Sequence, residues 1–480
     1  MSPEEAVSTE FDCKGMKRLP FVAIDQRWKA AFVVSIGVFM STLDASVVNI
    51  SLPTITQALK TNLGAVAWVV MGYLVIITGC LLFMGRLADL FGQRKLYLLG
   101  FSVFTVASGL CGFSPTIHFL IGSRMIQGLG GSALMAIGPA ILATSFPDAD
   151  RGRALGIAGS VVSAAFLTGP LLGGFLVEHL GWRSIFFVNL PIGAIGIFFS
   201  SKVLEKKERG TRVQMDLWGA FLLFLFLTFS LLFLNSLTHN PGSLLWGWLF
   251  LGLGCFGLFL AVELRSPSPL VDLHLFRERL FVSALGASLI SFWMGAAHGF
   301  VFPFFLQNIL GFSPSKAGML IFPVSLTVMV MAPLGGTFSD RVGVRIPASA
   351  GLILISLTVF SFTLLKGNEG DYHILWRQVL LGIGIGLFNP ANNSAIIGSL
   401  PREKIGLASS FLALVRNLGI MMGVALAEVI IAFRMPALSE AGRTDPTIEG
   451  IHDVWRLTMV LGLFAAVLSW TRVKLKRSGD

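Results

Sequence analysis

The chain has 480 residues, of which 54% are hydrophobic and only 13% are charged, and its formal net charge is +10. Soluble domains carry roughly 25% charged residues, so this chain has too few of them to cover a soluble surface of its size. The composition therefore excludes an ordinary soluble protein and indicates an integral membrane protein. The four cysteines show no paired spacing, so neither a disulfide framework nor a metal site is expected.

Windows of mostly apolar residues predict the membrane spans, because a helix needs about 20 such residues to cross the hydrocarbon core. Six spans are expected first, at 28–52, 64–84, 96–115, 118–145, 153–178 and 184–203. Two more follow at 216–237 and 244–264. A last group of six is expected at 280–309, 314–338, 345–366, 372–399, 405–433 and 455–472.

The distribution of positive charge predicts how these fourteen spans are oriented. Of the 36 Lys and Arg residues, 26 fall in segments on the same side as the N-terminus, 7 fall on the other side and 3 lie inside predicted helices. Positive residues gather on the cytoplasmic side of a membrane, so both termini are expected in the cytoplasm. The basic charge is then mostly an orientation signal, and no nucleic-acid partner is expected.

An internal repeat organises the chain. The segment 85–95, GRLADLFGQRK, has a weaker copy at 335–345, GGTFSDRVGVR, and a second pairing joins 155–158 to 405–408 at nearly the same offset. Parallel halves around a central site are a transporter architecture in which one half rocks against the other. We expect a tail at 1–27, a first bundle at 28–203, a linker with two inserted spans at 204–279, a second bundle at 280–472 and a tail at 473–480.

Two charged residues lie inside predicted spans of the first half. Asp44 is about nine residues from the outer end of the first span, and Arg124 is six residues into the fourth, so both could lie at comparable depth across a cavity. Intramembrane acids mark ion or proton pathways, and a low dielectric suits reversible protonation of a carboxylate. We expect Asp44 to hold a proton in one state and to pair with Arg124 or a cationic substrate in another. A structural ion pair that never titrates is the alternative.

The 85–95 segment and its copy place charges and glycines between apolar spans. The glycines permit a sharp turn, and Asp89 can cap or complement a helix N-terminus. The basic residues can pair with acids of the facing half or with lipid headgroups. We interpret the segment as a gate that holds the cytoplasmic side closed, against the plainer alternative of a topology anchor. The expected gate residues are Gly85, Arg86, Asp89, Gly92, Arg94, Lys95, Asp340 and Arg341.

The fifth span contains the sequence GPLLGG at 169–174. Gly169 and Gly173 share one helix face and allow a neighbouring backbone to approach closely. Gly174 adds to this surface of small residues. Pro170 removes a backbone hydrogen bond and is expected to bend the helix. Plain tight packing and a role in coupling both remain open for this motif.

Polar residues inside the second half could line a cavity. His298 could be a second proton carrier or a neutral histidine satisfied by a backbone carbonyl. Glu428 lies close to the outer end of its span and could snorkel to the surface. The candidates are His298, Gln307, Asn389, Asn392, Asn393, Arg416 and Glu428.

Four ordered stretches together resemble the major facilitator superfamily, and specifically its fourteen-span drug:proton antiporters: GRLADLFGQRK, LDASVVNISLP at 43–53, RMIQGLGGSALMAIGP at 124–139 and GPLLGGFLVEHLGWRSIFFVNLPIG at 169–193. The resemblance implies an all-α membrane protein with two six-helix bundles and two extra central helices. It implies export of amphipathic organic compounds in exchange for protons, as in multidrug efflux, in the cell membrane, with the 169–174 motif favouring exchange over leak. The first-helix stretch departs from the family pattern at Ala45-Ser46, where a threonine is expected nearby.

The sequence also restricts the energy source and the partners. No nucleotide-binding P-loop pattern is present, so an ion gradient is expected to drive transport, with the proton as coupling ion and no other cofactor. We find no nucleophile–base pattern or metal-ligand set, so no enzyme is expected. The expected partners are an amphipathic small molecule and the lipid bilayer, while a periplasmic adaptor is not specified by the sequence. A narrow-specificity exporter of a lipid, a siderophore or one antibiotic is the first alternative, and a non-transporting scaffold or sensor is the second.

Overall fold

The computed structural model describes residues 25–205, 217–239, 243–266, 273–367, 369–400, 405–440 and 446–471. Fourteen helices in these ranges are long and apolar enough to cross a membrane. Helices suit a bilayer because their backbone hydrogen bonds are satisfied within the segment. The predicted all-α class and the fourteen spans are confirmed. The predicted tails lie outside the described residues, apart from 25–27.

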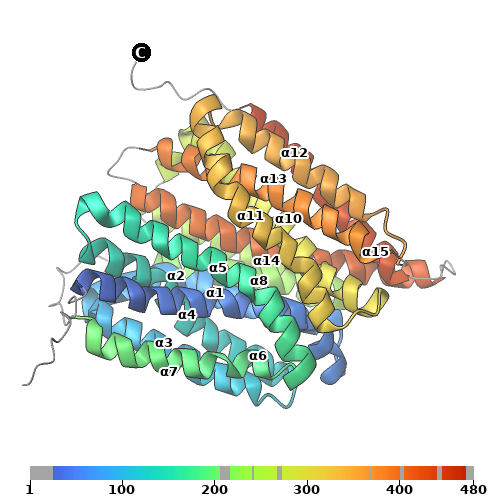
Figure 1. The fold of residues 1–480 in the computed structure, drawn as a ribbon, viewed down its shortest axis with the longest axis horizontal. Coiled ribbons are helices and arrows are strands. Elements are labelled where there is room, and N and C mark those ends of the chain that lie inside the picture. Colours follow the sequence, from blue (N-terminus) through green and yellow to red (C-terminus); the bar gives the residue numbers. More distant parts are fainter. Residues whose placement is uncertain are drawn as a thin grey trace, which may run out of the picture.

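The first six spans form one bundle, which occupies the lower part of Figure 1. Side chains of Asp25, Asn62 and Thr116 accept hydrogen bonds from backbone N–H groups in the first turns of their helices and so fix where these begin. The sixth span is interrupted at Val188 and consists of two helices. The elements are α1 (Gln26–Ala58), α2 (Leu63–Phe91), α3 (Gln93–Gly112), α4 (Ile117–Ser145), α5 (Asp148–Leu180), α6 (Ser184–Phe187) and α7 (Asn189–Val203).

The last six spans form the second bundle, in the upper part of Figure 1. The pairs α10–α14, α11–α13 and α12–α13 pack as α1–α5, α2–α4 and α3–α4 do in the first bundle. The elements are α10 (Arg279–Phe304), the single π turn η2 (Phe305–Ile309), α11 (Pro314–Val342), α12 (Arg345–Phe362), α13 (Asp371–Gly398), α14 (Ile405–Glu440) and α15 (Pro446–Trp470). The last span therefore begins nine residues before its predicted start at 455.

The turns within the two repeated charged segments are shorter than expected. Most of 85–95 is helical, as α2 continues to Phe91 and α3 starts at Gln93. Gly92 alone makes the turn, with a φ of 94°, and Gly343 makes the corresponding turn with a φ of 85°. Asp89 therefore lies inside α2 rather than at a helix N-terminus, and its predicted capping role is wrong.

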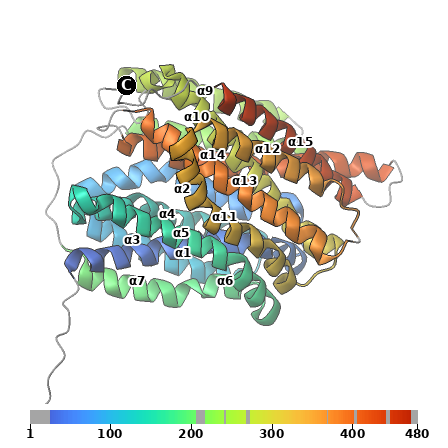
Figure 2. The same ribbon diagram turned by 45° about the horizontal axis from the view of Figure 1, so that its top comes forward.

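The two inserted spans, α8 (Leu217–His239) and α9 (Ser243–Arg265), lie beside the bundles rather than between them. Helix α8 packs against α2 and α14, one helix from each bundle, and α9 packs on α8. A long side chain from α8, Phe224, fills the space next to Gly79 of α2. Helix α9 lies at the outer edge of the molecule in Figure 2, followed by a short helix η1 (Leu273–Arg277).

The bundles meet near one end. Because the spans alternate in direction, Gln26, Gly92, Gly343 and Trp470 share one side, which we call the terminal side, and the other is the far side. Hydrogen bonds between the bundles lie toward the far side, where Gln307 donates from Nε2 to the Ile50 carbonyl at 2.8 Å. No hydrogen bond or ion pair between described side chains joins the bundles at the terminal-side helix ends. Among the described residues, the side-chain hydrogen bonds between the bundles thus lie toward the far side, and α5 and α11 converge there in Figure 1.

Candidate functional site

Asp44 of α1 and Arg124 of α4 form an ion pair inside the first bundle. The distance between Asp44 Oδ2 and Arg124 Nη1 is 2.6 Å, and the two side chains are 0% and 1% exposed. Removal of two charges from water costs several kcal/mol per ion, so such a pair needs further hydrogen bonds to be stable. The sequence-predicted pair is therefore in direct contact, but it is enclosed within one bundle rather than facing across a cavity.

Three neighbours form further hydrogen bonds with this pair, and an aromatic ring packs on the guanidinium. Asp44 Oδ1 accepts from Gln127 Nε2 and from Asn189 Nδ2, both at 2.9 Å. Arg124 Nε donates to the Val69 carbonyl at 3.2 Å, and the guanidinium lies 4.1 Å from the centre of the Tyr73 ring. The carboxylate thus accepts hydrogen bonds from three side chains, one of them charged.

One acceptor in this cluster has no donor. Asn189 is fully buried, and its Oδ1 has no hydrogen-bond partner among the described residues. The same amide already contacts Asp44 through Nδ2. Buried acceptors are seldom left without a partner, so an unused oxygen next to a carboxylate is a site where an added proton could be accommodated.

Sequence analysis did not single out Gln127 and Asn189, although both lie in the quoted motifs. Gln127 follows Arg124 by three residues, a spacing that places both side chains on one helix face. Asn189 interrupts an otherwise apolar stretch, the one where α6 and α7 meet. The signals were therefore an amide one turn from a charge and a polar residue within an apolar span.

A cavity of about 200 Å³ lies between the bundles. Its walls come from α1 and α5 of the first bundle and from α10–α13 of the second. Two residues of α1, Ser46 and Asn49, line it and follow Asp44 within about one helical turn. Asp44 itself is not part of the lining. The helix that carries the buried acid therefore also forms part of the cavity wall.

The predicted cavity residues of the second half have different locations. Only His298 lines the cavity between the bundles. Gln307 belongs to η2 and bonds to α1 on the far side, while Asn392 donates to the Ala284 carbonyl and to Ser288 Oγ, which holds α13 to α10. Glu428 does not reach the surface: it is 2% exposed and lines a separate cavity of about 400 Å³ at the far side. Three more are half-buried and outside the central lining: Asn389, Asn393 and Arg416.

The 169–174 motif packs in two directions. A Cβ atom on Gly169 would clash with the Ser46 side chain, and one on Gly173 would clash with Ile50, so this face lies directly on α1. Gly174 faces the other bundle, where a Cβ would clash with the Pro314 carbonyl of α11. The motif thus connects the helix of the buried acid to the opposite bundle.

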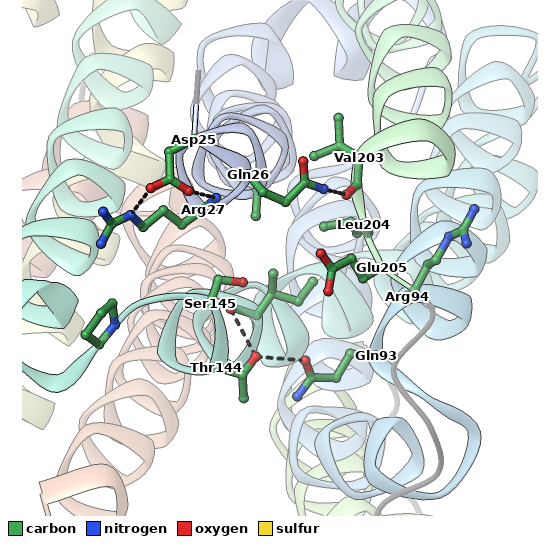
Figure 3. A pocket seen from close by; sticks show the side chains of 13 residues that line it. Asp25, Gln26, Arg27, Gln93, Arg94, Thr144, Ser145, Val203, Leu204 and Glu205 are labelled. Atoms are coloured by element: carbon green, nitrogen blue, oxygen red, sulfur yellow. Dashed lines mark hydrogen bonds and ion pairs between the residues drawn. The ribbon is translucent and has the colours of Figure 1, made fainter. Parts of the chain in front are cut away.

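The terminal-side ends of the first bundle are fastened to one another around a pocket of about 350 Å³ (Figure 3). Gln26 Nε2 donates to the Val203 carbonyl at 2.6 Å, and Thr144 bonds to Gln93 at 3.3 Å. Arg94 donates to the Ser201 carbonyl at 2.5 Å. These bonds join the ends of α1, α3, α4 and α7, so this end of the bundle can move as one body.

The remaining gate residues make few contacts in this state. No hydrogen bond or ion pair links Arg86, Asp89, Asp340 or Arg341 to another side chain in the described part of the chain. Among the described gate residues, Arg94 is the one with a side-chain hydrogen bond, and that bond stays within its own bundle. The described gate side chains therefore do not join the two bundles in this state.

A family model described as Major Facilitator Superfamily matches residues 34–424 and 284–477. The chain belongs to this superfamily. It is 36% identical over 404 residues to the riboflavin transporter RibZ of Clostridioides difficile, a match that covers 83% of this chain and 87% of that protein. It is 33% identical over 417 residues to the multidrug resistance protein Stp of Mycobacterium tuberculosis, a match that covers 84% of this chain and 76% of that protein.

Solved structures support the superfamily fold. A bacterial homologue of the human lysosomal transporter Spinster superposes with a TM-score of 0.68 at 16% identity, covering 93% of this chain and 97% of the other. A peptide transporter, POT, superposes with a TM-score of 0.67 at 14% identity and covers 92% and 94%. The predicted superfamily, with two six-helix bundles, is confirmed, and RibZ, the protein related to Spinster, and POT are transporters by name.

Proposed function

We propose that this superfamily member exports amphipathic organic compounds in exchange for protons, by rocking its two bundles around the central cavity. It acts in the cell membrane with the terminal side in the cytoplasm, where 26 of its 36 Lys and Arg residues lie. The proton is the coupling ion, and no other cofactor is needed. The relative named as a multidrug resistance protein supports a drug-like cargo.

The observation that carries this proposal is the buried Asp44–Arg124 pair next to the cavity wall. With the far side fastened, Arg124, Gln127 and Asn189 donate hydrogen bonds to the carboxylate. A proton on Asp44 removes the charge–charge attraction to Arg124 and makes the carboxyl group a hydrogen-bond donor. Asn189 Oδ1, which has no partner among the described residues, can accept this hydrogen bond after its amide rotates. Movement of α1 then changes the cavity through Ser46 and Asn49.

Two candidate functions differ in how many different compounds the protein exports. The multidrug relative favours a broad range, and the riboflavin relative favours a single solute. A narrow exporter of one lipid, siderophore or antibiotic therefore remains the second candidate. A scaffold or sensor without transport has no comparable support, because the buried pair and the gate residues are both present.

A substrate screen in proteoliposomes with an imposed proton gradient tests the proposed function. We expect uptake of several unrelated amphipathic dyes into inside-out vesicles that are acidic inside, and loss of this uptake when the gradient is collapsed. Accumulation of one compound only would establish the narrow exporter. Transport that is indifferent to collapse of the gradient would contradict proton coupling.

Replacement of Asp89 by asparagine is expected to shift the protein away from the state with a closed cytoplasmic side, because Asp89 belongs to the segment that we interpret as the gate of that side. Double electron–electron resonance between labels at the exposed residues Phe91 and Val342 would show the short-distance population fall. The matched control is Asp371→Asn, an exposed acid at the far side that bonds to Lys316 within its own bundle. An unchanged distribution would leave only the topology anchor.

A further inference from the structure

The lining of the central cavity contains no Asp, Glu, Lys or Arg side chain. The acid nearest along α1, Asp44, lies outside the lining and is engaged by Arg124, Gln127 and Asn189. The basic residue nearest along α13, Arg377, bonds to Ser361 and to the His373 carbonyl. No permanent charge therefore reaches the space where a cargo would bind.

Two buried polar side chains of this wall have unsatisfied hydrogen-bonding atoms. His298 of α10 is 6% exposed and Gln378 of α13 is 1% exposed. Both ring nitrogens of His298, and both the oxygen and the nitrogen of the Gln378 amide, have no hydrogen-bond partner among the described residues. Since buried polar groups without partners destabilise a fold, two of them on one cavity wall indicate that a ligand completes their bonds.

The rest of the wall is apolar and suits a ring system. The ring of His298 is stacked on that of Phe302, with 4.6 Å between their centres. Phe166 faces the cavity from the first bundle, and aliphatic side chains such as Ile321 and Ile355 fill the remaining wall. Binding sites of this kind are mostly apolar, with a few polar groups that fix the orientation of the ligand.

We propose that the cavity binds an uncharged ring compound that carries both a hydrogen-bond donor and an acceptor, and that His298 and Gln378 recognise these two groups. A neutral imidazole offers one donor and one acceptor, and a primary amide offers an NH2 donor group and a carbonyl acceptor, so together they match such a compound. A cationic cargo would be buried without a counter-ion, which is strongly unfavourable in a low dielectric. The proposal refines the cargo of the proposed exporter, and it replaces the expectation that a cationic substrate pairs with Asp44.

Binding to the purified protein in nanodiscs, without any gradient, tests this selectivity. Acridone is a neutral fused-ring compound with one N–H and one carbonyl group, and 10-methylacridinium is a permanent cation of nearly the same size. We expect acridone to bind at least about tenfold more tightly, as measured by fluorescence anisotropy. Equal or tighter binding of the cation to the unaltered protein would overturn the proposal, and this comparison requires no variant to fold.

Variants then assign the recognition to the two side chains. His298→Ala and Gln378→Ala are each expected to weaken acridone binding about tenfold. The matched control is Thr358→Ala, which removes a buried hydroxyl outside the cavity lining that is already bonded to the Leu354 carbonyl at 2.7 Å. Unchanged affinity in both alanine variants would contradict the assignment.

A variant that gains binding of the cation would show that charge, rather than shape, excludes the cation from the unaltered cavity. Gln378→Glu places a carboxylate in the cavity at nearly constant volume and is expected to allow 10-methylacridinium to bind. Failure of the proposed proton coupling would leave these binding results intact, since no gradient is present. Proton-driven export that strongly prefers the cation would contradict the cargo assignment and leave the proposed function standing.

Discussion

Replacement of Asp44 by asparagine is expected to reduce proton-driven export to the level of protein-free liposomes. An amide of the same shape cannot bind and release the proton, and it leaves the Arg124 guanidinium buried without its counter-ion. Removal of one partner from a buried ion pair typically costs about 3–5 kcal/mol of unfolding free energy, so the variant is also expected to melt earlier. Export in inside-out vesicles and thermal unfolding in detergent would measure the two effects.

Controls separate the lost proton from the lost stability. Asp25→Asn alters an exposed acid that precedes the same helix, and it should export normally. The double variant Asp44→Asn/Arg124→Gln removes both buried charges and should recover much of the stability without recovering export. Cargo exchange down its own gradient should continue in the double variant. Full gradient-driven export by Asp44→Asn would exclude Asp44 as the proton carrier.

Replacement of Gly318 by valine is expected to prevent closure of the far side. Gly318 of α11 lies against the carbonyl of Pro170 on α5, where any Cβ atom would clash with backbone rather than with a flexible side chain. The bundles can then no longer approach at this crossing, so export should fall to near background. Labels at Lys60 and Lys366, in a background without the native cysteines, should report longer distances across the far side.

The control for this variant is Gly122→Val, which adds the same atoms to a helix face with no neighbour within 4 Å. It should export normally and leave the far-side distances unchanged. Overpacking typically costs about 1–3 kcal/mol, so a Gly318→Ala variant with a smaller clash provides an intermediate case. Normal export and unaltered distances in Gly318→Val would show that this crossing is not part of the gate.

Helix number and the two six-helix halves followed from the sequence, because hydrophobic length and an internal repeat can both be read directly from it. The corresponding turns at Gly92 and Gly343 lie where the repeat placed them. The predicted helix ends were less accurate. The start of α15 was predicted nine residues too late, because its first turns after Pro446 are too polar for a hydropathy window to include them. The side-by-side position of α8 with α2 and α14 was also not predictable, since nearly all its faces are apolar.

Only those site residues that carry a charge within an apolar span could be predicted with their role. Asp44 and Arg124 were found because an ionised group inside a span must have a partner, whereas amides such as Gln378 gave no comparable signal. The partners of each side chain depend on rotation of the helices about their axes, which hydropathy does not determine. Gln307 illustrates this: it was expected in a cavity, but it lies in the π turn η2 and joins the bundles instead.

The absence of fixed charge from the central cavity has an electrical consequence. Exchange of an uncharged cargo for one proton carries one net positive charge into the cell in each cycle. The membrane potential then contributes to the driving force as well as the pH difference, at about 2.3 kcal/mol per charge for each 100 mV. Such an exporter would keep working at neutral external pH, powered by voltage alone.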